Sequence, residues 1–132
     1  GYKLTALGPS RSHPDENEGS LVLKLEFANV SFLFAADVLA AGQEDLLRRG
    51  IDLRADVLKV PHHGTYKGGS ATPFFMAVRP KYAIITCDAG EGDVPDDGVV
   101  EKLQNVGATV LRTDETGNVV FRSDGSNLQM KP

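Results

Sequence analysis

Cysteine, the usual sulfur ligand of metals in proteins, is scarce in the sequence. The chain contains one cysteine, Cys87, and it also has no tryptophan. A single cysteine excludes an intrachain disulfide framework and the cysteine-rich classes of zinc site. Because Cys87 ends an apolar stretch, we interpret it as a small core residue rather than a nucleophile. Histidine and carboxylate side chains remain as the candidate metal ligands, and the chain has three histidines to supply.

Positive charge and long apolar runs are also scarce. With 14 lysines and arginines against 18 acidic residues, the formal net charge is −4. This balance argues against a broad basic surface that binds duplex nucleic acid, but it allows a small catalytic cleft with a few lysine or arginine side chains. No run reaches the roughly 18 apolar residues of a membrane span, so no membrane segment is expected in this chain. Because the chain starts at Gly1 without a methionine, we expect a cloning remnant or a processing point in a longer protein.

The order of sequence patterns predicts the fold class. Two early strands are followed by alternating strands and helices and then by a closing hairpin, which indicates an α/β or α+β fold with helices covering a mixed sheet. The length of 132 residues fits a single domain, 1–132. The expected strands are 3–7, 21–27, 30–36, 57–60 and 82–87, with the hairpin at 109–113 and 119–123; the expected helices are 43–49, 72–78 and 97–105.

The strand at 21–27 shows the clearest alternation in the chain. Leucines and Phe27 occupy one face, and Lys24 and Glu26 occupy the other. Such a pattern is typical of a strand that is buried on one face only. We expect the helix at 43–49 to carry Glu44 and Asp45 in its first turn, where negative charge interacts favourably with the helix dipole.

Two of the predicted strands end in residues that can bind metals. Asp37 follows the strand at 30–36, and His62 and His63 follow the strand at 57–60. Carboxyl ends of strands are where ligands bind in open sheets, so neighbouring strands would bring these residues to one edge. Imidazole and carboxylate together suit zinc, manganese or iron, and Gly64 allows the loop to turn sharply. Alternatively, one histidine satisfies backbone groups and Asp37 caps a turn, since adjacent residues of an extended strand point to opposite sides.

Several spaced motifs together resemble a known family. The stretches SLVLKLEF, FLFAAD, EDLLRRG and DLRADVLKVPHHG, between Ser20 and Gly64, closely resemble the carboxy-terminal metallo-β-lactamase-fold domain of ComEC-type competence proteins. The likeness continues through AVRPKYAII at 77–85, VVEKL at 99–103 and RTD at 112–114. The resemblance implies a four-layer αββα sandwich with a dinuclear metal site between its sheets. This chain would supply the carboxy-terminal half of that domain.

The resemblance also implies a function and roles for individual residues. It implies a metal-dependent hydrolase, a phosphodiesterase or nuclease that acts on DNA in competence-type DNA uptake. Asp37 matches the bridging aspartate, and His63, with His62 as the alternative, matches a later metal ligand. The other histidine, Lys59 and Lys67 would face the substrate. The implied cofactor is zinc or manganese, and the implied partner is single-stranded DNA or another phosphodiester.

Three departures from the family pattern weaken the implied metal site. The motif His-x-His-x-Asp-His is absent, the glycine before the bridging aspartate is Ala36, and the late Gly-His-Pro-His reads DVPD at 93–96. In that stretch Asp96 offers either an oxygen ligand or a helix cap. A catalytic metal ordinarily takes three protein ligands, whereas this chain firmly offers two. The alternative function is therefore a non-catalytic, metal-free binding or dimerisation module derived from the same fold.

Half of a sandwich would also leave a sheet face uncovered. Large apolar patches seldom stay exposed, so we expect a homodimer or pairing with the N-terminal half of the parent domain. The location depends on the parent, because the domain would lie on the extracytoplasmic side of the membrane in a competence protein and in the cytoplasm if it is free-standing.

Overall fold

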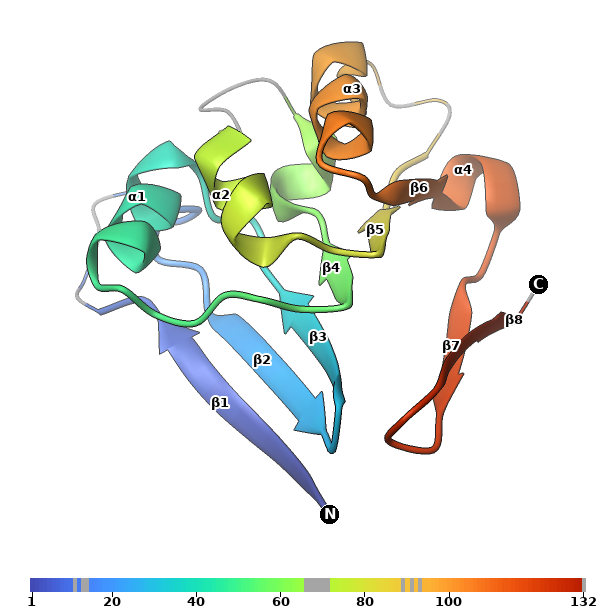
Figure 1. Cartoon of the computed structure of the whole chain (residues 1–132). Coiled ribbons are helices and arrows are strands. Elements are labelled where there is room, and N and C mark those ends of the chain that lie inside the picture. The colour runs from blue at the N-terminus through green and yellow to red at the C-terminus, as the bar shows by residue number, and fades with distance from the viewer. Residues whose placement is uncertain are drawn as a thin grey trace.

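The computed structural model describes residues 1–10, 12, 15–65, 72–88, 90, 92 and 94–131. A six-stranded mixed sheet forms its centre (Figure 1). Three helices pack on one face of this sheet, and a separate two-stranded hairpin lies against the other face. The predicted α+β class, a mixed sheet covered by helices, is confirmed.

The central sheet combines antiparallel and parallel pairing. Its strands follow the order β1-β2-β3-β4-β5-β6, where β1 to β3 are antiparallel and β3 to β6 are parallel. Their bounds are Tyr2–Gly8 (β1), Val22–Phe27 (β2), Val30–Phe34 (β3), Val57–Lys59 (β4), Tyr82–Ile85 (β5) and Thr109–Arg112 (β6). The hairpin pairs β7, Val120–Ser123, with β8, Leu128–Lys131.

Three helices connect the parallel strands and cover one face of the sheet: α1 (Ala40–Arg48), α2 (Thr72–Val78) and α3 (Asp97–Asn105). A short helical turn η1 at Pro61–Gly64 follows β4, and a one-turn helix α4 (Thr113–Thr116) leads from β6 to the hairpin. In the part of the chain that the structure describes, no helix is both long and apolar enough to cross a membrane.

The core lies between the sheet and the helices. Phe74 and Phe75 of α2 are fully buried against strand residues such as Leu33, Leu58 and Ile85. Val99 and Leu103 of α3 join the same cluster, and Cys87 packs at its margin. The interpretation of Cys87 as a small core residue agrees with this position.

The predicted closing hairpin is wrong. Residues 109–112 form β6, which joins the central sheet parallel to β5, and residues 113–116 form the helical turn α4. The hairpin instead turns at Asp124 and Gly125, where the Asp124 carboxylate accepts hydrogen bonds from the backbone N–H groups of Ser126 and Asn127. The Asp-Gly pair is a strong turn signal, and it identifies β8 as the missing partner strand.

The two faces of β2 are used in an unexpected way. Lys24 lies on the face covered by helices and is 5% exposed, because its ammonium group donates to the backbone oxygen of Asp52 and lies near two carboxylates. The apolar face of β2 points to the helix-free side of the sheet. There Leu25 pairs with Leu4 on one side and with Phe32 on the other.

Candidate functional site

The structure brings Asp37 and His63 together. Strands β3 and β4 are parallel neighbours, so the residues that follow them meet at one edge of the sheet. The Nε2 atom of His63 lies 3.5 Å from Oδ1 of Asp37, and the two side chains are 46% and 41% exposed. The expected shared edge is therefore present, and a ligand in solution can reach both side chains.

The histidine pair lies in a left-handed turn rather than in an extended strand. Strand β4 ends at Lys59, and His62, His63 and Gly64 have φ values of 47°, 57° and 75°. The alternation argument therefore does not apply to the two imidazoles, whose ring centroids are 6.4 Å apart. A residue other than glycine in this region costs about 1–3 kcal/mol, and such strain is concentrated at functional sites. The backbone N–H of His62 helps to hold the turn by donating to the Ala36 oxygen at 2.9 Å.

The ring of His63 is oriented by a residue that the sequence analysis did not identify. Its Nδ1 atom lies 2.7 Å from the backbone oxygen of Thr86 and 2.9 Å from the Thr86 hydroxyl. A carbonyl oxygen only accepts, so in the neutral ring Nδ1 carries the proton and donates it to Thr86. The Nε2 lone pair then faces the Asp37 carboxylate.

This geometry suits a cation between the two side chains. An unprotonated nitrogen and a carboxylate oxygen at 3.5 Å are both acceptors and cannot bond to each other. Histidine ligands of metals commonly donate their second N–H to a carbonyl, as His63 does to Thr86. Asp37 and His63 therefore fit two positions of a metal. Within the described residues, no group of three or more histidine, cysteine or acidic side chains is placed to hold one.

His62 and Lys59 lie beside this pair. The Nδ1 atom of His62 is buried and has no hydrogen-bond partner in the described part of the chain. The ammonium group of Lys59 donates to the Ala36 backbone oxygen at 3.1 Å. Burial lowers the pKa of Lys59, and the negative charge of Asp37 opposes this shift. The other predicted substrate contact, Lys67, lies outside the described residues.

Asp96 caps a helix. Its carboxylate accepts hydrogen bonds from the backbone N–H groups of Gly98 at 2.9 Å and Val99 at 3.3 Å, at the start of α3. Its own N–H donates to the oxygen of Gly64 at 2.9 Å. Of the two roles considered for Asp96, the structure shows the cap, and the backbone bond ties α3 to the histidine turn.

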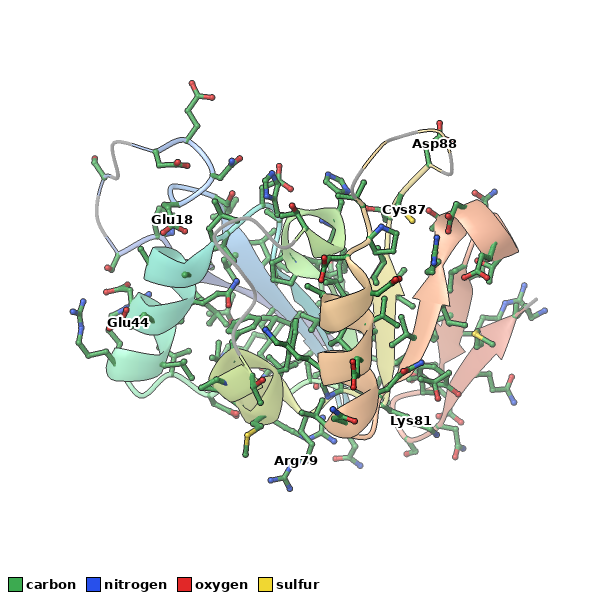
Figure 2. The ribbon with its side chains drawn as sticks, turned by 90° about the horizontal axis from the view of Figure 1, so that it is seen from above. Glu18, Glu44, Arg79, Lys81, Cys87 and Asp88 are labelled. Carbon is green, nitrogen blue, oxygen red and sulfur yellow. The ribbon has the colours of Figure 1, made fainter. Side chains whose placement is uncertain are left out.

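The segment around Asp37 is held from the loop that precedes β2. The Asp37 N–H donates to the Ser20 hydroxyl at 3.2 Å. The Glu18 carboxylate accepts from Leu39 N–H at 2.7 Å and from Gly42 N–H at 3.2 Å. Glu18 thereby caps α1, and Figure 2 shows it on the same edge of the molecule as Cys87, opposite the cations of the 79–81 segment.

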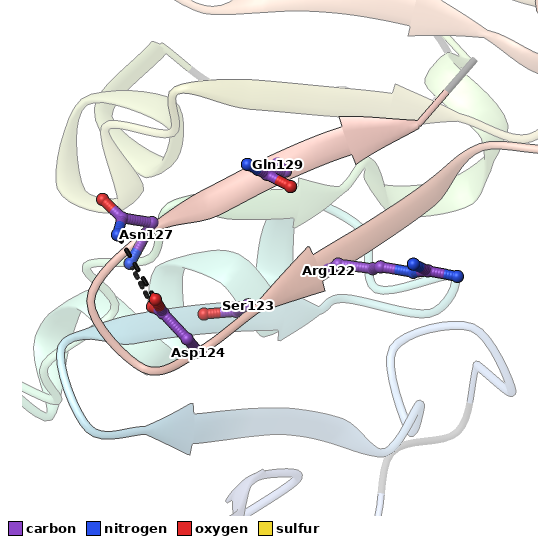
Figure 3. A pocket seen from close by; sticks show the side chains of 5 residues that line it. All are labelled: Arg122, Ser123, Asp124, Asn127 and Gln129. Atoms are coloured by element: carbon purple, nitrogen blue, oxygen red, sulfur yellow. Dashed lines mark hydrogen bonds between the residues drawn. The ribbon is translucent and has the colours of Figure 1, made fainter.

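Two hollows lie away from the paired side chains. A polar pocket of about 280 Å³ on the β7–β8 hairpin is lined by Arg122, Ser123, Asp124, Asn127 and Gln129 (Figure 3). An apolar groove of about 290 Å³ on the helix-free face of the sheet is lined by Phe32, Leu33, Phe34, Val57, Lys59, Ile84, Val119 and Phe121. The groove reaches the candidate site through Lys59, whereas the pocket shares no lining residue with that site.

Comparison with known proteins points to one family. No protein-family model matches the chain. The chain is similar to ComE operon protein 3 of Bacillus subtilis (strain 168), with 35% identity over 120 residues that cover 88% of this chain. The aligned region is 15% of that protein, so the chain spans a small part of its relative's length. The similarity supports the relationship to ComEC-type competence proteins that the sequence motifs predict.

Proposed function

We propose that this chain forms one wall of the metal site of a phosphodiester hydrolase that acts on DNA during competence-type DNA uptake. The observation that carries the proposal is the approach of two atoms that can bind a metal, His63 Nε2 and Asp37 Oδ1, to 3.5 Å on an exposed sheet edge. The chain's similarity to a competence operon protein supplies the biological setting.

In this proposal each side chain at the edge has a distinct task. Asp37 and His63 hold zinc or manganese, and His62 and Lys59 contact phosphate oxygens of single-stranded DNA or another phosphodiester. When bound, the cation supplies Lewis-acid activation of water and of a phosphoryl oxygen. The exposed position of Asp37 and His63 lets a substrate approach them without a change in the fold.

The remaining ligands are proposed to come from the N-terminal half of the parent domain. Support comes from the helix-free face of the sheet, where Leu4, Leu25 and Phe32 form a continuous apolar row across three strands. A second layer packed on this face would bury the row and complete a sandwich. Such a layer would also reach the edge where Asp37 and His63 end their strands.

Metal analysis of the full-length parent tests the proposal, because the remaining ligands are proposed to lie outside this chain. The parent is loaded with zinc or manganese and dialysed, and its bound metal is measured by mass spectrometry beside the Asp37→Ala and Glu44→Ala variants. Glu44 is exposed on α1 and serves as the carboxylate control. We expect the wild type and Glu44→Ala to retain the metal and Asp37→Ala to lose it. Equal metal in all three proteins would contradict the assigned ligands.

Cleavage is tested on the parent protein. The full-length parent and its Asp37→Ala variant are compared for cleavage of single-stranded DNA in the presence of manganese. Loss of cleavage in the variant, with its fold retained, is the expected result. Cleavage that survives the substitution would contradict the hydrolytic role of this edge.

The donor count favours a second function, a metal-free binding or dimerisation module. The described residues contain two candidate ligands and no group of three or more, whereas a catalytic metal ordinarily takes three. Under this alternative neither the chain nor its parent retains metal, and Asp37→Ala leaves partner binding unchanged. The same metal analysis therefore separates the two functions.

A further inference from the structure

We propose that Thr113 is a positioning residue for the candidate metal ligand His63, which it orients through the peptide unit between Thr86 and Cys87. The inference deepens the proposed function, since it rests on His63 being a ligand. Among the described residues, Thr113 forms no hydrogen bond with His63 or Asp37, and its effect is carried by its hydrogen bonds to Cys87, which follows β5.

The peptide unit between Thr86 and Cys87 connects Thr113 to His63. The carbonyl of Thr86 accepts the Nδ1 proton of His63 at 2.7 Å, and the N–H of Cys87 donates to the Thr113 hydroxyl at 2.9 Å. Both groups belong to the same peptide plane. The peptide is trans, because the described cis bonds are Gly8–Pro9 and Val94–Pro95. In a planar trans unit the C=O and N–H point in opposite directions, so a partner on the N–H fixes the direction of the carbonyl.

The Thr113 hydroxyl both donates and accepts a hydrogen bond, so its orientation is fixed. It donates its proton to the backbone oxygen of Cys87 at 3.1 Å and accepts from the N–H of the same residue. Donating in one direction leaves a lone pair for the other, so one hydroxyl holds both backbone groups of Cys87. The rotation of the peptide plane before Cys87 is thereby restricted.

The residues on either side of Thr113 in the sequence are also held by side-chain contacts. The next residue, Asp114, has a side chain that is 4% exposed and receives two hydrogen bonds from Arg112, at 2.6 and 3.0 Å. The Cys87 thiol donates to the same carboxylate at 3.3 Å. Residues on both sides of Thr113 are thus tied to β6 and to the end of β5. The RTD motif at 112–114, which has no direct contact with the ligand pair, acquires a role in placing His63.

A purely structural role for Thr113 would have a different signature. In that case the hydroxyl would only join β5 to α4, and its removal would lower the stability of the chain without changing the state of the His63 ring. In the positioning role, removal frees the Thr86 carbonyl to turn. The His63 ring then loses its preference for the Nδ1–H tautomer, and a smaller fraction of the rings presents an unprotonated Nε2 to the cation.

The test compares wild type, Thr113→Val and Thr113→Ser. Valine keeps the shape but removes the hydroxyl, whereas serine keeps the hydroxyl. Nitrogen-detected NMR of the His63 ring is recorded without metal at alkaline pH, where imidazole is neutral. We expect the Nδ1–H tautomer to dominate in wild type and Thr113→Ser and to be lost in Thr113→Val. Zinc titration of the full-length parent should show an affinity about 10-fold weaker for Thr113→Val alone, the lower end of the usual effect of an outer-shell partner.

The outcomes keep the positioning role and the proposed function apart. An unchanged tautomer in folded Thr113→Val, or a wild type with mainly Nε2–H, overturns the positioning role whatever the zinc result. If Thr113→Val does not fold, Thr113→Ala takes its place, because alanine also removes the hydroxyl. A normal tautomer response without zinc binding in the wild-type parent supports the positioning role and counts against the metal-dependent function.

Discussion

At the residue scale, Ala36 carries strain next to the candidate ligand Asp37. Its φ is 50°, a conformation that glycine adopts freely and that costs other L-residues about 1–2 kcal/mol. The departure from the family's glycine therefore falls where positive φ is required. We predict that Ala36→Gly raises the free energy of unfolding by about 0.5–1 kcal/mol, since the gain in the folded state exceeds the added entropy of the unfolded chain. Urea denaturation measures the change.

A helical alanine provides the matched control. Ala41 is exposed in α1, where glycine is unfavourable by roughly 0.5–1 kcal/mol relative to alanine. Ala41→Gly should therefore lower stability while Ala36→Gly raises it. A loss of stability in both variants would contradict the account of strain at Ala36.

The Asp114 carboxylate makes stability depend on pH. Hydrogen bonds from Arg112 hold the pKa of Asp114 below its ordinary value of 3.8. A carboxyl with a lowered pKa in the folded state stabilises the fold above its unfolded pKa, and this contribution is lost as the pH falls through the folded pKa. We predict that Asp114→Asn lowers stability at pH 7 and that its difference from wild type shrinks in acid.

Urea denaturation at neutral and acidic pH checks this prediction. Glu101→Gln, at an exposed position of α3, makes the same charge change away from Arg112. This control should have little effect at either pH. A difference between Asp114→Asn and wild type that is constant across the pH range would show that the carboxylate is not the source of the stabilisation.

At the element scale, local patterns predict most strands and helices but miss what distant residues supply. The bounds of α2 and α3 match the expected 72–78 and 97–105, because their capping and breaking residues are local in sequence. Helix α1 instead begins at Ala40, three residues before the predicted start, and has no acidic residue in its first turn. Glu18 provides that charge from the preceding loop.

We predict that Glu18→Ala lowers the free energy of unfolding by about 1 kcal/mol, the typical value of a helix cap. Its carboxylate satisfies two N–H groups, those of Leu39 and Gly42, that have no partner within the helix. The control is Glu16→Ala in the same loop, where the side chain is exposed. Urea denaturation of both variants is the measurement. An equal effect of the two substitutions would show that the contribution is general charge rather than capping.

The candidate site was predictable only in part for a similar reason. Asp37 and the histidines could be identified because metal-binding residue types follow strands that become parallel neighbours. Thr86 acts mainly through its backbone carbonyl, a group that every residue possesses, so no residue type marks it. Thr113 acts through a hydroxyl at the start of α4, and only the pairing of β5 with β6 brings it near.

At the scale of the whole molecule, both faces of the sheet carry apolar side chains. The face under the helices holds the buried core and also accommodates Lys24 with its partners. The helix-free face carries Leu4 and Leu25 beside Phe32, which packs against Phe121 of the hairpin. The alternation in β2 predicts a strand with one apolar face, but that face is not the one that this chain covers with helices. A face of this kind indicates that another layer packs on it.

We predict that this chain, on its own, covers the helix-free face by forming a homodimer. Light scattering at micromolar concentration should give the mass of a dimer for the wild type. Leu4→Lys should give a monomer that keeps its fold, because Leu4 is 56% exposed in β1 on that face. Met76→Lys is the matched control, since Met76 is 59% exposed but lies on α2, on the helix side, and it should remain a dimer. A monomeric wild type, or equal dissociation of both variants, would contradict an interface on this face of the sheet.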